Sequence, residues 1–286
     1  MVTMVVPHVT PEDVLTRLLN TLPVSEHAPL LLDGGSQEVP ASAILDPEWI
    51  EHEMHLRAER WQVDDPLILG TVLWRAISSS LVLPTVASLF VTGTALSPRL
   101  QDVILHRRAL TGRDVDFVAS GTTSTLDGTF SPNRKMYGRL VGARSTAVLA
   151  TSAESALVDA LGSGIEYLAS LCGKGERRLW AVAVDSIATR YLWVGTATGR
   201  VDEALEAARA TVREISEQLG GPRLPSPRFQ EVVTECGWEP QTFVHRVSCC
   251  LLYNGPHGIK CSTCPRQHPD VRLARLSDRA RRLGRS

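Results

Sequence analysis

The sequence has almost no net charge and lacks any glycine-rich nucleotide-binding motif. Its 30 lysines and arginines balance 31 aspartates and glutamates, so the formal net charge of the 286-residue chain is -1. Because there is no excess of positive charge to attract phosphates, the composition argues against nucleic acid as a partner. The missing glycine motif argues against a nucleotide-consuming synthetase. No internal repeat or low-complexity tract is present either.

An export signal is also missing. Residues 1–19 have no basic start, and Pro7, Pro11, Glu12 and Asp13 fall where a signal peptide would be continuously apolar. We therefore expect a cytoplasmic protein. Six cysteines in a reducing compartment are not expected to form a disulfide framework, so their clustering points to metal or redox chemistry.

One apolar stretch is either a membrane-spanning segment or a buried helix. Residues 76–98 carry no formal charge and are long enough to cross a bilayer. Serines and threonines recur through the stretch, Pro84 interrupts it, and Arg75 precedes it in the same periodic pattern. We interpret it as a buried helix of the protein body. Peripheral contact with the inner membrane is left open.

The spacing of apolar residues predicts an α+β fold that is predominantly helical, with short antiparallel strands. Residues 103–105 and 115–118 flank a turn and predict a central β-hairpin. Residues 243–264 predict a C-terminal β-hairpin that would bring two cysteine pairs together. Helices are predicted from caps and apolar periodicity over 10–22, 46–61, 151–168, 179–194 and 202–219.

The domain organisation follows from a short linker. Residues 222–227 hold three prolines after a helix that Gly220 and Gly221 end. We predict a helix-rich body with the central hairpin over 1–221, which would bind substrate, and a cluster-binding region over 222–286. The linker is too short to require independent domains, so one continuous domain is the alternative.

Four cysteines carry the chemistry. Cys249, Cys250, Cys261 and Cys264 place four thiols within sixteen positions. Thiolates are soft ligands that select zinc, copper(I) or iron–sulfur units. Structural zinc normally takes its cysteines from knuckles with two to four intervening residues, which an adjacent pair cannot form. Neighbouring side chains on a strand also point apart, and a two-iron unit tolerates that splay better than one zinc ion.

The spacing Cys-Cys-x10-Cys-x2-Cys near the C-terminus resembles the signature of the FhuF-type ferric siderophore reductases. The resemblance implies that Cys249, Cys250, Cys261 and Cys264 hold a 2Fe-2S cluster. It further implies an oxidoreductase that reduces imported ferric siderophores, most often of the hydroxamate type, and releases Fe(II) in the cytoplasm. A distant relation to part of the siderophore synthetases is implied as well.

Two alternatives remain beside the reductase. The same cluster would serve a redox or iron sensor without substrate turnover, and a structural zinc module would use the same thiols. Cys172 and Cys236 are interpreted as small core residues, and His257 and His268 as solvated neighbours of the site. Basic residues near the cysteines predict a docking surface for an acidic ferredoxin, a flavin reductase or an anionic chelate. They are Lys260, Arg266, Arg272, Arg275 and Arg279.

Overall fold

Proline and acidic caps start the N-terminal helices where the sequence predicts them. In the computed structural model, the Thr10 side chain and Asp13 form a capping box at the start of α1, and Asp46 caps α2. The structure describes residues 9–31, 36–109, 138–145, 152–173, 175–221, 223–233, 240–256, 258 and 260–283. The described helices are α1 Pro11–Thr21, α2 Pro47–Trp61, α3 Pro66–Leu81, α4 Leu83–Thr92, α5 Ala153–Leu171, α6 Glu176–Ala197, α7 Val201–Gln218 and α8 Pro269–Leu283.

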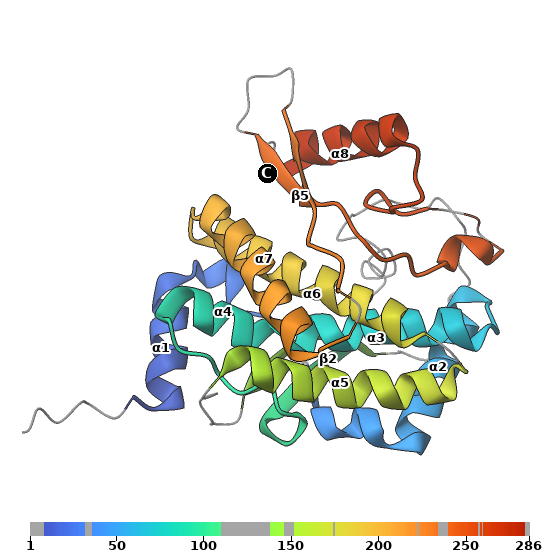
Figure 1. Cartoon of the computed structure of the whole chain (residues 1–286), viewed down its shortest axis with the longest axis horizontal. Helices are drawn as coiled ribbons and strands as arrows, with labels where there is room; N and C mark the ends of the chain where they lie inside the picture. Colours follow the sequence, from blue (N-terminus) through green and yellow to red (C-terminus); the bar gives the residue numbers. More distant parts are fainter. Residues whose placement is uncertain are drawn as a thin grey trace, which may run out of the picture.

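Two buried helices, α3 and α6, form the centre of the body (Figure 1). The indole Nε1 of Trp74 on α3 donates a hydrogen bond to the Leu179 carbonyl at 3.0 Å. The hydroxyls of Ser78 and Ser186 share another hydrogen bond, at 2.8 Å, between the same two helices. The polar groups that the sequence places in these apolar helices therefore have partners, as buried polar groups require.

The apolar stretch noted in the sequence becomes α3 and α4. Within the described part of the chain, residues 66–92 are the one helical stretch that is long and apolar enough to cross a membrane. In its most apolar window, 72% is buried inside the protein. This burial agrees with its interpretation as core helix.

The central sheet has three antiparallel strands in the order β1-β2-β3, namely Ser36–Pro40, Val103–Ala109 and Gly138–Ser145. Strand β2 confirms the strand predicted from residue 103. The second strand predicted for the hairpin, 115–118, lies outside the described residues. Among the described residues, β2 pairs with β1 and β3. The overall prediction of a mainly helical fold with short antiparallel strands is confirmed.

The C-terminal hairpin predicted across the cysteines is not confirmed. The strand pair of this region precedes them: β4 Phe229–Val232 pairs with β5 Gln241–Val244. Among the described residues between 249 and 264 there is no strand, and Leu252–Asn254 forms a short 3-10 turn instead. Leu251 and Gly258 have positive φ angles of 60° and 61°, which end any extended run at these points.

Helix α8 covers the β4-β5 pair. Leu276 and Ala280 pack against Val232 on β4 and Phe243 on β5. Figure 1 shows α8 and β5 together on one side of the molecule, with α6 and α7 beneath them. The cysteine segment runs between this layer and the helical body. The predicted boundary at residues 221 and 222 stays a prediction.

Two glycines on α5 test the packing of the core. A Cβ atom at Gly164 would lie 2.7 Å from the buried ring of Trp74, whereas one at Gly162 would meet nothing closer than Trp180 at 3.9 Å. We expect Gly164→Ala to lower the free energy of unfolding by about 1–3 kcal/mol through overpacking. Gly162→Ala is the matched control and should leave stability unchanged or raise it by up to about 1 kcal/mol through helix propensity. Equal stabilities of the two variants in urea unfolding would contradict this packing.

Candidate metal centre

The cysteine segment follows β5 and is held against the helical body by one carboxylate. Asp185 lies in the middle of α6 and is 5% exposed. Its oxygens accept hydrogen bonds from the backbone N–H groups of Val247 at 2.8 Å and Ser248 at 3.0 Å. The Ser248 hydroxyl donates to the same carboxylate. The residue just before the cysteine pair is therefore fixed to α6.

Three of the four thiols lie together. The sulfurs of Cys249 and Cys264 are 3.7 Å apart, and the Cys264 thiol is also within hydrogen-bonding reach of Cys261. The pair Cys261 and Cys264 is joined by a tight turn, in which the Cys264 N–H donates to the Cys261 carbonyl at 3.0 Å. This turn brings the two ends of the C-x-x-C sequence to the same side, as the spacing predicts.

The fourth thiol, Cys250, points into an apolar cluster formed with Val63, Ile68, Leu69 and Val72. Its divergence from Cys249 is the splay expected of neighbouring residues on an extended backbone. Within the described residues, no group of three or more His, Cys, Asp or Glu side chains is arranged to hold a metal ion. To share one centre with the other three thiols, Cys250 would have to turn out of this apolar cluster.

Backbone N–H groups and a guanidinium group face the sulfurs. The N–H groups of Leu251 and Arg266 donate to the sulfurs of Cys249 and Cys264. Arg246, which is 2% exposed, directs its Nη1 toward the sulfur of Cys261 at 3.7 Å. Such donors stabilise thiolates and are the usual surroundings of sulfur bound to metal.

The electrostatics favour the thiolate form at two of the three neighbouring thiols, Cys249 and Cys261. A hydrogen bond from the Cys264 thiol, supported by the positive charge of Arg246, lowers the pKa values of Cys249 and Cys261. Sharing its hydrogen with two such neighbours raises the pKa of Cys264. Since the thiolate is the form that binds metal, the site is prepared for a soft cation or cluster.

A buried hydroxyl at the same turn has no partner. Ser262 lies between the two cysteines of the C-x-x-C sequence and is 7% exposed. Its Oγ makes no hydrogen bond within the described part of the chain. An unpaired buried hydroxyl is costly, and a bound sulfur-rich group would supply an acceptor. The thiols, the N–H donors and this hydroxyl thus fit a thiolate-bound group in the surroundings they provide.

The remaining sequence candidates lie elsewhere. Cys172 ends α5, where its thiol donates to the Pro66 carbonyl at 3.2 Å, so it has a packing role. Cys236 and His257 lie outside the described residues. His268 is exposed and pairs with Asp270 at 3.4 Å. None of these described groups joins the cysteine site.

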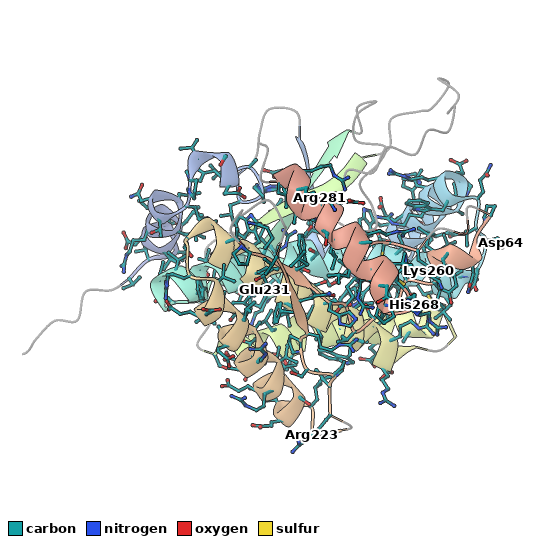
Figure 2. The ribbon with its side chains drawn as sticks, turned by 90° about the horizontal axis from the view of Figure 1, so that it is seen from above. Asp64, Arg223, Glu231, Lys260, His268 and Arg281 are labelled. Atoms are coloured by element: carbon teal, nitrogen blue, oxygen red, sulfur yellow. The ribbon has the colours of Figure 1, made fainter. Side chains whose placement is uncertain are left out.

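The five basic residues predicted for docking divide into two sets. Arg272 is buried and donates to the Gln230 side chain at 3.2 Å, and Arg279 lies over the Phe243 ring at 5.2 Å, so both attach α8 to the strand pair. The others lie near the C-x-x-C turn: Lys260 donates to the Arg266 carbonyl at 3.1 Å, and Arg275 donates to the Lys260 carbonyl. Figure 2 shows Lys260 and His268 beside the start of α8 and Arg281 toward its other end.

Sequence reasoning missed the residues that support the site. Asp185, Arg246 and Arg75 are not cysteines and have no motif spacing to the thiols. One signal was present, because Asp185 is the one acidic residue in the mostly apolar stretch from Leu179 to Val194, and buried charges are normally paired. The partner could not be identified, since it comes from a segment more than sixty positions later in the chain.

The thiols can be tested one at a time. Replacing Cys249, Cys250, Cys261 or Cys264 by Ser keeps the size of the side chain and removes the soft ligand, so the visible charge-transfer absorption that a 2Fe-2S cluster on these thiols would give should be lost or severely weakened. Cys172→Ser and Cys236→Ser are the matched controls and should retain the spectrum. A normal spectrum in Cys250→Ser would show that the fourth ligand is not Cys250, and its loss in Cys172→Ser would overturn the assignment.

Comparison with known proteins adds no family to this site. The chain matches no protein-family model, no curated protein sequence and no solved structure. The features that characterise the site are therefore the cysteine spacing and the contacts around the thiols. These contacts describe a partly buried thiol cluster with N–H donors and a guanidinium group, attached to the helical body through Asp185.

Proposed function

We propose that this chain is a cytoplasmic ferric siderophore reductase whose thiols Cys249, Cys250, Cys261 and Cys264 hold a 2Fe-2S cluster. The observation that carries the proposal is the pattern of an adjacent cysteine pair and a C-x-x-C turn, in which the Cys264 thiol lies next to those of Cys249 and Cys261. The spacing is that of the FhuF-type reductases. When bound, such a cluster supplies one electron at a time.

The ligand set favours a two-iron unit over zinc. Structural zinc is tetrahedral and needs all four sulfurs within bonding distance of one ion. Cys249 and Cys250 diverge, and Cys250 packs among the side chains of α3. A unit with two metal positions needs only two of the sulfurs at each position, so the divergence is easier to accommodate.

The substrate class follows from the chemistry of iron chelates. Siderophore oxygens are hard donors that hold Fe(III) far more tightly than Fe(II). The Fe(III) of a hydroxamate-type chelate would accept one electron, become Fe(II) and exchange out of the chelate. The electron would come from a ferredoxin or a flavin reductase. No acid or base residue is required for this one-electron step.

The residues of the chain would supply binding, orientation and charge. The N–H groups of Leu251 and Arg266 and the guanidinium of Arg246 stabilise the thiolates. Lys260, Arg266 and Arg275 form a basic rim outside the C-x-x-C turn, which suits an acidic ferredoxin or an anionic chelate. Arg272 and Arg279 are engaged in packing and contribute to docking only by holding α8 in place.

Anaerobic mixing of the reduced protein with a ferric hydroxamate tests the function. We expect reoxidation of the protein, followed by its visible spectrum, with one Fe(II) captured in a chelating trap per electron. The gallium(III) hydroxamate of the same shape is the control: it should compete for binding without oxidising the protein, because gallium(III) accepts no electron.

The negative outcome has a specific meaning. Protein that stays reduced with hydroxamate, catecholate and mixed-ligand ferric chelates, yet is oxidised by an artificial acceptor, would reject the reductase. That result would favour a redox or iron sensor, in which the same group changes the binding of a partner.

A further inference from the structure

Two arginines and one carboxylate meet beside the thiols. Arg246 follows β5, Arg75 comes from the middle of α3, and Asp185 comes from α6. Each arginine lies close enough to Cys250 and Cys261 for those thiols to raise its pKa. Both guanidinium groups thus interact electrostatically with the same two thiols.

Arg246 is fixed in place. Its Nε donates to Asp185 Oδ2 at 3.3 Å and its Nη2 donates to the Ser248 hydroxyl at 3.2 Å. The third nitrogen, Nη1, is left to face Cys261 at 3.7 Å. Although burial lowers it, the pKa of Arg246 is raised overall by Asp185 and the two thiols. Asp185 therefore keeps this charge in place and orients it toward sulfur.

Arg75 has a different environment. Within the described part of the chain its guanidinium makes no hydrogen bond and no ion pair, although it lies half-buried among the elements around the site. Burial, and then the positive charge of Arg246, lower the pKa of Arg75 to about 10, so it stays charged at neutral pH. Two cations consequently face one carboxylate.

An excess positive charge in a half-buried position is unfavourable unless an anion balances it. Among the described residues, the acidic groups whose charge acts on both arginines are Asp185 and the thiols of Cys250 and Cys261. A 2Fe-2S cluster bound by four thiolates is negatively charged and becomes more negative when it takes up an electron. A nearby fixed cation stabilises the more negative form more strongly, because Coulomb energy scales with charge.

We propose that Arg75 and Arg246 balance the charge of the bound cluster and raise its reduction potential, and that Asp185 is the positioning residue that aims Arg246 at Cys261. This inference rests on the 2Fe-2S cluster of the proposed function, but not on the identity of the substrate. It assigns a role to three residues that are neither ligands nor part of the cysteine pattern.

The midpoint potential of the iron-loaded protein, measured by an EPR-monitored redox titration, tests the role of Arg75. We expect Arg75→Gln to shift it to a more negative value, with about a tenfold lower equilibrium constant for reduction, equivalent to 59 mV for one electron. Arg75→Lys keeps the charge and should stay near the wild-type potential. Arg200→Gln is the matched control, because it removes a charge beyond the C-terminal end of α6, where Arg200 pairs with Glu203, and should leave the potential unchanged.

The positioning role of Asp185 is tested by a double-mutant cycle on the same potential. Arg246→Gln should lower the potential of the wild-type protein, and should lower it less in the Asp185→Asn background, where the guanidinium is no longer aimed. Ser248→Ala, which removes the second contact of Arg246, serves where Asp185→Asn does not accumulate. A role limited to folding would lower the unfolding temperature and leave the effect of Arg246→Gln the same in both backgrounds.

The outcomes separate this inference from the proposed function. Wild-type potentials in both Arg75→Gln and Arg246→Gln would overturn the inference and would leave the proposed reductase function untouched. If these variants shift the potential but the wild-type protein reduces no ferric chelate, the reductase function is rejected and the inference is supported. A wild-type protein that assembles no iron and sulfide would reject both.

Discussion

The carboxylate of Asp185 is the contact on which the arrangement of the site depends. It lies in the middle of α6, the central helix of the body, and accepts two backbone hydrogen bonds, a hydroxyl and a guanidinium from the segment just before the cysteine pair. A buried carboxylate is stable only when it is fully paired, so α6 and this segment hold each other in a defined position. The position of the thiols is therefore set by the contact with α6, although the thiols themselves lie on an irregular loop.

The same contact links the structure to the proposed chemistry. A loop without strands can still present its sulfurs reliably if its two ends are fixed. Asp185 holds the end near Cys249, and the turn between Cys261 and Cys264, followed by α8 on the β4-β5 pair, holds the other. Between them, Gly255 passes so close to Val63 that a Cβ there would lie 2.7 Å from its methyl group. The loop is thus pressed against the connection between α2 and α3, just before the helix that contributes Arg75.

Local signals in the sequence were sufficient for most of the helices and for the ligand candidates. Thr10 and Asp46 start helices because cap and proline chemistry is decided within a few residues. The cysteine hairpin was not predictable in the same way. Alternating residues from 243 onward suggest strands, but Leu251 adopts a left-handed backbone conformation that its side chain does not favour and that tertiary contacts must maintain. The roles of Arg75 and Asp185 could not be predicted from the sequence. They arise from packing between distant helices, and no local pattern encodes such contacts.

The proposed electron transfer requires that the four thiols bind a 2Fe-2S cluster, and the metal and sulfide content of the protein tests this most directly. Protein made in iron-replete medium and purified without oxygen should contain about two irons and two acid-labile sulfides per chain. Stoichiometric zinc with no acid-labile sulfide would contradict the 2Fe-2S assignment and identify the site as a structural zinc module.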